Sequence, residues 1–119
     1  MPRYLLIKNA ELYAPEPMGR QDILIIGEQV AQVGPALSPV PGLEGGVIDA
    51  AGRTVIPGYV VPHVHNIGGG GESGPYSRTP EVQLSAVTTA GVTTLVGLLG
   101  TDGTTRHLES LLAKARALD

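Results

Sequence analysis

The feature that most constrains this chain is a change in its hydrophobic pattern near residue 58. Before this point, apolar or alternating segments such as "YLLIKNAELYA", "DILIIG" and "EQVAQVG" are separated by the Pro/Gly-rich stretches "APEPMGRQ" and "GPALSPVPGLEGG". Short apolar runs between such breakers are typical of β-strands joined by turns. "GGVIDAAGRTVIPG" indicates two more short strands around a turn at Ala51-Gly52. Residues 1–57 are therefore predicted to form a small β-rich domain.

From Gly58 onward the pattern alternates between strand and helix. "GYVVPHVHNI" indicates an apolar strand, and "TPEVQLSAVTTAG" carries signals for both ends of a helix. Thr79 is a suitable N-cap, Pro80 suits the first helical position, and Glu81 lies in the first turn, where the helix dipole favours an acid. Gly91 is a natural helix terminator. We therefore predict a helix that begins after Thr79 and ends before Gly91.

A second strand and a second helix follow in the same order. "VTTLVGLL" predicts a buried strand, and "TTRHLESLLAKARALD" predicts a helix with one apolar face. That face is formed at i, i+3, i+4 and i+7 by Leu108, Leu111, Leu112 and Ala115. Because strands joined by helices pair in parallel, residues 58–119 are predicted to begin an α/β domain with a parallel sheet.

Composition limits the kinds of site that this chain can hold. The 119 residues include no cysteine, so disulfides and thiolate metal sites are excluded, and any metal must be bound by histidine and carboxylate. The net charge of −3 shows no basic excess of the kind that nucleic acid or an anionic membrane requires. No apolar stretch approaches the length of a membrane span. We expect a cytoplasmic protein that binds neither nucleic acid nor membrane.

Two of the three histidines lie in "PHVHNIGGGGESG", one residue apart. Side chains at i and i+2 of a strand point to the same face, so His63 and His65 project together and can both reach one ion. In a parallel barrel, the end of the strand is also where the active site lies. A chance pair on a half-exposed strand is the alternative, and a pair alone is a weak motif.

The four glycines that follow have three possible interpretations. They can form a flexible linker, or a loop that binds phosphate, although the Gly-Lys-Ser/Thr sequence of such loops is absent and Glu72 has the wrong charge. They can also let the backbone approach a ligand closely, which only glycine permits. In that case Glu72 would present its carboxylate to a cationic group such as an ammonium.

The segments "VIPGYVVPHVHNIGGGGESGPYSRTPEVQLS", "AGVTTLVGLLGTDG" and "ESLLAKARAL" closely resemble the bacterial isoaspartyl dipeptidase family of the amidohydrolase superfamily. The resemblance is dense from Val55 to Leu118 and diffuse before it. It implies a small β-sandwich-like segment plus the first two βα units of an incomplete (β/α)8 metallo-hydrolase barrel. It also implies zinc, with two ions in a complete enzyme, a β-aspartyl dipeptide substrate, and a homo-oligomer at full length.

The resemblance also implies roles for individual residues. His63 and His65 would bind the more buried zinc, and Glu72 would bind the free α-amino group of the substrate. Gly70 and Thr101 would help to hold the substrate. Taken by itself, Thr101 is more readily explained as a capping residue near Asp102.

Two departures from the family pattern affect the expected activity. Amidohydrolases usually carry aspartate two residues before the first metal histidine, where this chain has Val61. The family's bridging ligand, later metal histidines and catalytic aspartate would lie beyond Asp119, and His107 is expected to be solvated on a helix. We therefore place no catalytic residue in this chain, and we predict that the 119 residues alone bind zinc weakly and are inactive.

Three hypotheses remain from the sequence. The chain can be the N-terminal part of an isoaspartyl dipeptidase or of another amidohydrolase-type metal hydrolase. It can be a non-catalytic binding or interaction module derived from an amidohydrolase. It can also be a β-domain protein in which the His-x-His pair is structural. The coding sequence downstream would distinguish the first hypothesis from the others, because it predicts an in-frame barrel with further histidines and an aspartate.

Overall fold

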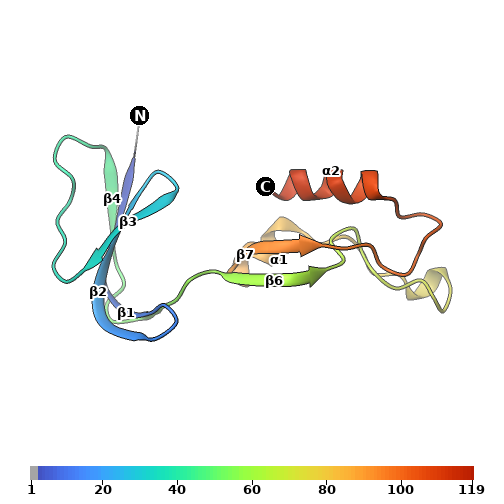
Figure 1. Ribbon diagram of the computed structural model, residues 1–119, viewed down its shortest axis with the longest axis horizontal. Helices are drawn as coiled ribbons and strands as arrows, with labels where there is room; N and C mark the ends of the chain where they lie inside the picture. The colour runs from blue at the N-terminus through green and yellow to red at the C-terminus, as the bar shows by residue number, and fades with distance from the viewer. Residues whose placement is uncertain (1–2) are drawn as a thin grey trace. The chain divides into compact units, whose positions relative to one another are not determined.

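The computed structural model describes residues 3–119, which divide into two compact units (Figure 1). The first unit extends to Pro57 and the second is Gly58–Asp119. The chain is mixed α/β, and strands predominate over helices. No helix within residues 3–119 combines the length and the apolar character needed to cross a membrane.

The first unit contains a single five-stranded sheet. Its strands are β1 (Tyr4–Tyr13), β2 (Pro17–Ile26), β3 (Gln29–Gly34), β4 (Gly45–Asp49) and β5 (Thr54–Val55). The strand order is β3-β2-β1-β4, and β5 also pairs with β1. Strand β2 is antiparallel to both β1 and β3. Strands β4 and β5 run parallel to β1. The expected second layer of a β-sandwich is therefore not present among the described residues of this unit.

A bulge interrupts the pairing of β1 with β2. The β1–β2 register shifts between Ile7 and Ala10, and Asn9 has a positive φ of 56°. The buried Asp22 carboxylate accepts the Asn9 amide at 2.8 Å and the Leu37 amide at 2.9 Å, and it pairs with Lys8 Nζ at 3.2 Å. The hydrogen bond from the Asn9 amide is the main cause that lowers the pKa of Asp22. One carboxylate thus ties the bulge to the loop after β3.

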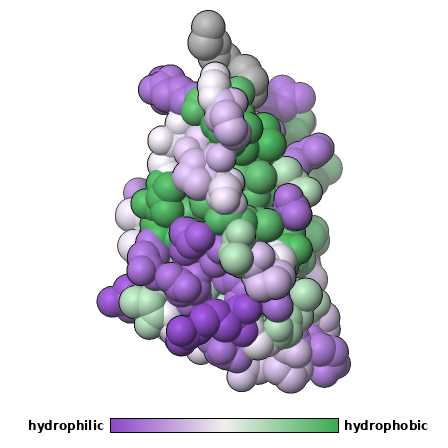
Figure 2. Space-filling view, turned by 90° about the vertical axis from the view of Figure 1, so that its left-hand side faces the viewer, coloured by the Kyte–Doolittle hydropathy of each residue, from purple (hydrophilic) through white to green (hydrophobic). Residues whose placement is uncertain are grey.

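The hydrophobic core of the first unit is small. Its packed cluster consists of Ala10, Leu12, Ile23 and Ala50. Large apolar side chains also remain exposed on the same unit, among them Val30, Val47 and Ile48. Figure 2 shows hydrophobic surface beside hydrophilic surface on the face of this unit. The sheet therefore buries part of its apolar side chains and leaves others in solvent.

Two sequence predictions for the first unit have different outcomes. The turn at Ala51-Gly52 is confirmed, because these residues have φ values of 52° and 78° between β4 and β5. The stretch "APEPMGRQ" was predicted to be a loop, and this is wrong for its second half. Strand β2 begins at Pro17, because the backbone from Pro17 to Gln21 pairs with the second half of β1.

The second unit contains a parallel strand pair and two α-helices. Its elements are β6 (Tyr59–Val64), a 3-10 helix (Pro75–Ser77), α1 (Leu84–Thr89), β7 (Val92–Gly97) and α2 (Leu108–Leu118). Strands β6 and β7 run parallel, with Tyr59 opposite Val92 and Val61 opposite Leu95. The predicted strand-helix-strand-helix order and the parallel pairing are confirmed (Figure 1).

The predicted start of the first helix is wrong. Helix α1 begins at Leu84 after Gln83, and Thr79 is not its N-cap. The reason is that Thr79 hydrogen-bonds to Gly69, while the Val82 amide donates to the Asn66 carbonyl at 3.2 Å. These bonds hold the preceding segment in a non-helical form.

The predicted end of α1 is confirmed. Gly91 has φ 74° directly after the C-cap residue Ala90, which is the left-handed conformation that favours glycine. Its amide donates to the Thr88 carbonyl at 3.0 Å. The helix therefore ends where the sequence signal places it.

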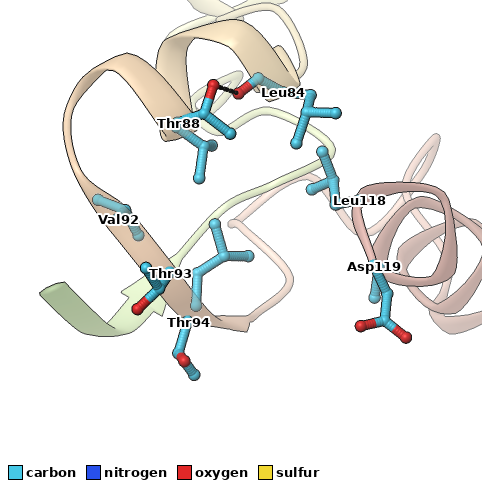
Figure 3. Close-up of a pocket in the computed structure, with 10 residues that line it drawn as sticks. Leu84, Thr88, Val92, Thr93, Thr94, Leu118 and Asp119 are labelled. Carbon is cyan, nitrogen blue, oxygen red and sulfur yellow. Dashed lines mark hydrogen bonds between the residues drawn. The ribbon is translucent and has the colours of Figure 1, made fainter. Parts of the chain in front are cut away.

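The apolar surfaces of the second unit are only partly covered. Strand β7 was predicted to be buried, but its residues are exposed or half-buried because β6 is its only strand neighbour in the described residues. On α2, Leu108 and Leu112 are exposed, so the predicted apolar face does not pack as a whole. A groove of about 500 Å³ lies between α1, β7 and the end of α2, lined by Leu84, Leu95 and Leu118 among others (Figure 3).

Candidate functional site

The histidine pair lies at the carboxyl end of β6. His63 is within the strand, and His65 follows its last residue, Val64. The two ring centroids are 5.0 Å apart and the rings are nearly perpendicular, at 83°. Both side chains therefore project to the same side of the chain.

A backbone hydrogen bond fixes the orientation of one ring. His65 Nδ1 lies 3.2 Å from the Leu98 carbonyl oxygen, just after the end of β7. Because a carbonyl can only accept, this bond requires the proton on Nδ1, and in the neutral ring the lone pair is then on Nε2. Metal-binding histidines commonly have such a carbonyl partner on the second ring nitrogen. The Leu98 carbonyl thus fixes the orientation of the His65 ring.

The glycine loop, defined here as Ile67–Glu72, is ordered by its neighbours. The Gly69 amide donates to Thr79 Oγ1 at 2.8 Å, and the Gly71 amide donates to Ser77 Oγ at 3.1 Å. Gly70 has φ 70°, and a Cβ atom there would lie closer than 3.0 Å to the Ser77 carbonyl oxygen. The loop is therefore not a flexible linker, and glycine is required at Gly70 by both conformation and space.

A buried arginine lies behind this loop. Arg106 is 4% exposed and precedes helix α2. Its Nε donates to the Ile67 carbonyl at 3.1 Å, its Nη1 to Gly70 at 3.1 Å, and its Nη2 to Gly69 at 3.2 Å. Nη2 also lies 3.4 Å from the Thr79 carbonyl. One guanidinium thus binds three carbonyls of the glycine loop and lies next to the carbonyl of Thr79.

The structure brings Glu72 and Thr101 together. Thr101 Oγ1 donates to Glu72 Oε2 at 2.9 Å, although 29 residues separate them in sequence. The backbone amide of Glu72 and then the Thr101 hydroxyl lower the pKa of the Glu72 carboxyl, so this exposed group is ionised at neutral pH. The interpretation of Thr101 as a cap near Asp102 is therefore wrong.

Asp102 organises the turn that follows and does not cap α2. Its carboxylate accepts the Thr104 amide at 3.0 Å and the Thr105 amide at 3.1 Å. Arg78 Nε and Arg106 Nη1 lie 3.4 Å and 3.7 Å from its Oδ2. Hydrogen bonds from Thr105 are the main cause that lowers the pKa of Asp102 to about 2.

Three further residues of the second unit were singled out by their type or by the sequence pattern. Asn66 is fully buried beside Gly97, and neither side-chain amide atom has a hydrogen-bond partner among the described residues. Val61 is half-buried in β6. His107 is exposed, as expected, but it occupies the N-cap position of α2 and is not within the helix.

Sequence reasoning missed two residues that build the site. Nothing in "GTDGTTRHLES" distinguishes Arg106 from a solvated arginine next to a helix, because its partners are backbone carbonyls 27 to 39 residues away. Thr79 was assigned to a helix because Thr-Pro-Glu is also a good helix start. The polar Thr79 hydroxyl could equally bind a neighbouring loop, and the structure shows that it does.

The residues present fit part of a zinc site. Two histidines on one side of a strand end, one of them with a carbonyl partner on Nδ1, are suitable nitrogen ligands. Within residues 3–119, however, no group of three or more His, Cys, Asp or Glu residues could hold an ion. The described chain therefore offers two ligands of a possible four-coordinate site.

Comparison with known proteins identifies relatives for almost the whole chain, although no family model matches it. The β-aspartyl dipeptidase of the thermophile Fervidobacterium islandicum AW-1 superimposes with a TM-score of 0.86 at 44% identity, covering 97% of this chain and 31% of that enzyme. Its complex with the β-Asp-Leu dipeptide gives a TM-score of 0.82 at 43% identity, covering 97% and 30%. Dihydroorotase of Staphylococcus aureus strain MRSA252 is 34% identical over 114 residues, which are 96% of this chain and 26% of that protein.

The chain spans about a third or less of the length of these relatives. Within that share, the similarity to the dipeptidase runs through both units, and the dihydroorotase match shows that the relationship extends to other hydrolases. By sequence and by structure, the chain therefore belongs to the amidohydrolase superfamily and resembles part of a β-aspartyl dipeptidase.

Proposed function

We propose that this chain carries the segment of a zinc-dependent β-aspartyl dipeptidase that binds one metal ion and the free amino group of the substrate. The observation that supports this most directly is the Thr101–Glu72 hydrogen bond, which places an ionised carboxylate in the same unit as the histidine pair. The relative that was solved with β-Asp-Leu supports the choice of substrate class.

In this proposal His63 and His65 bind zinc through ring nitrogens, and further ligands come from outside residues 3–119. When bound, zinc supplies Lewis-acid polarisation of the scissile amide carbonyl. The Leu98 carbonyl holds the His65 ring in its ligand orientation. Two neutral ligands alone leave the other tetrahedral positions to water, so the 119 residues bind zinc weakly.

Glu72, Gly70 and Thr101 form the substrate-binding part of the proposal. The Glu72 carboxylate accepts hydrogen bonds from the ammonium of the β-aspartyl residue, and the Thr101 hydroxyl orients that carboxylate. Gly70 lets the loop backbone lie close to the substrate because it has no side chain. A carboxylate bound to the ammonium is poorly placed to act as the general base.

The two units correspond to two parts of the proposed enzyme. Residues 1–57 form the small β-domain, and residues 58–119 contribute the first two βα units of a β/α-barrel, whose remaining units lie elsewhere. In this proposal, the general acid or base that passes a proton to the leaving amine comes from outside residues 3–119. The 119 residues alone are therefore inactive.

A chimera tests this function directly. The matched 31% of the Fervidobacterium enzyme is replaced by this chain, and release of aspartate from β-Asp-Leu is measured with zinc present. The chimera should hydrolyse the dipeptide, and the isolated 119 residues should not. His63→Ala in the chimera should abolish turnover, whereas His107→Ala, which changes an exposed histidine, should leave the rate unchanged.

Two results would contradict the proposal. A folded, zinc-loaded chimera that does not release aspartate would show that this segment does not serve a β-aspartyl dipeptidase. Turnover by the isolated, monomeric chain that is lost in His63→Ala would show that these residues complete a catalytic site by themselves.

A further inference from the structure

The glycine loop is the element on which the proposed binding of the substrate amine depends, because Glu72 is its last residue. Three loop carbonyls, those of Ile67, Gly69 and Gly70, point to one guanidinium. These charge-assisted bonds hold the path of the loop, because the guanidinium cannot move toward one carbonyl without leaving another.

The geometry points to Arg106 as the positioning residue of the glycine loop, which sets the place of Glu72 without touching the substrate. The effect of Arg106 on substrate binding rests on the proposed function, whereas its effect on the position of the loop does not. The Arg106 side chain is 3% exposed, so its charge is removed from water and is compensated by the loop carbonyls and by Asp102. It binds to the loop from the protein side and leaves the Glu72 carboxylate exposed.

The same loop also packs against the metal-binding ring. A Cβ atom on Gly69 would lie 3.2 Å from His65 Cδ2, and one on Gly100 would lie 3.8 Å from His65 Cγ. The loop held by Arg106 and the segment after β7 therefore both lie against the His65 ring. Through Gly69, Arg106 also limits where this ring can sit.

Lysine cannot replace arginine at this position. The guanidinium presents donors in a planar fork, and Nε, Nη1 and Nη2 each bind a different carbonyl of the loop. An ammonium is a single point with three donors and a different reach, so it cannot keep all of these bonds. Arg106→Lys therefore tests the role of the planar fork, because it retains the positive charge and removes the fork of donors.

The test uses amide hydrogen exchange of the 119-residue chain by NMR. In the wild-type chain, the Gly69 and Gly71 amides should exchange slowly because Thr79 and Ser77 accept from them. Arg106→Lys should accelerate both by about tenfold or more, since hydrogen bonds to charged groups contribute about 1.5–3 kcal/mol. The Leu98 amide, which joins β7 to β6 through the Val64 carbonyl, should be unchanged. Arg116→Lys, on the exposed surface of α2, is the matched control.

A titration with β-Asp-Leu forms the second arm and is followed at the Thr101 and Glu72 resonances. The dipeptide should shift these resonances in the wild-type chain. Arg106→Lys should bind the dipeptide about tenfold more weakly, while the His65 ring keeps its Nδ1–H tautomer. If the wild-type chain does not respond but the exchange result holds, the proposed function fails and the role of Arg106 stands.

Other outcomes overturn the inference. Equal acceleration of Gly69, Gly71 and Leu98 would show only a general loss of stability, and no acceleration would show that the loop does not depend on the fork. If Arg106→Lys fails to fold, the NMR spectrum of the wild-type chain tests the contact between Arg106 and the loop. The Arg106 Nε–H should be slowly exchanging and scalar-coupled to the Ile67 carbonyl carbon, and its absence would contradict the contact.

Discussion

Replacing Gly70 by alanine should destabilise the second unit and displace the proposed substrate loop. The residue has φ 70°, and a Cβ atom there would lie closer than 3.0 Å to the Ser77 carbonyl oxygen. The left-handed conformation costs an L-residue about 1–2 kcal/mol. Relief of the contact with backbone, which cannot rotate away as a side chain can, adds about 1–3 kcal/mol. The free energy of unfolding should therefore fall by about 2–5 kcal/mol.

The measurement is thermal and urea unfolding followed by far-UV circular dichroism. For a unit of this size, about 1 kcal/mol shifts the midpoint by about 4–8 °C, so a decrease of roughly 10 °C or more is expected. Gly103→Ala is the control, because a Cβ atom there meets nothing within 4 Å and the backbone is not left-handed. It should change stability by less than about 0.5 kcal/mol.

The reasoning would be refuted if Gly70→Ala and Gly103→Ala both lowered the free energy of unfolding by an equally small amount. That result would mean that the loop moves freely away from Ser77 and that Arg106 and Thr79 do not hold it. A large loss in both variants would also refute it, because the effect would then not depend on the contact at Gly70. Only a loss specific to Gly70 agrees with the structure.

Three more predictions concern single side chains. Val61→Asp should strengthen zinc binding about 10–100-fold in the chimera, as a carboxylate close to the metal ligands does in other sites, and calorimetric titration of zinc measures it. Thr101→Val should raise the pKa of Glu72, because the hydroxyl that stabilises its ionised form is lost; a carboxyl carbon-13 NMR titration checks this, and an unchanged pKa would exclude the bond. Asp102 has a pKa lowered from 3.8 to about 2, so the stability that it contributes is complete above about pH 4 and is lost as the pH falls toward 2. Unfolding midpoints of wild type and Asp102→Asn should therefore converge in that range, and a constant difference would contradict the assignment.

Local patterns in the sequence were sufficient to predict the order of elements. The strand before Ala51, the turn at Ala51-Gly52 and the parallel pairing of β6 with β7 follow from apolar periodicity and from the positions of glycine. The turn and the end of α1 at Gly91 depend on neighbours in the chain. The parallel pairing joins distant strands, and it follows from the order of strands and helices along the chain.

Features that depend on distant partners could not be predicted in this way. Thr79 has the sequence context of an N-cap, but its hydroxyl binds Gly69, ten residues earlier. Arg106 is buried because three carbonyls of the glycine loop surround it, and no local pattern encodes them. The proximity of Thr101 to Glu72 was implied by the family resemblance alone, and the spacing in the chain gave no indication of it.

The central claim is that Glu72 binds the free ammonium of a β-aspartyl dipeptide. The most direct test compares β-Asp-Leu with N-acetyl-β-Asp-Leu as substrates of the chimera and of its Glu72→Gln variant. Loss of a charge-assisted hydrogen bond of about 1.5–3 kcal/mol predicts that acetylation lowers kcat/KM about 10–100-fold with Glu72 present and much less with glutamine. If acetylation has the same effect in both proteins, the ammonium is recognised elsewhere and the account of this site is wrong.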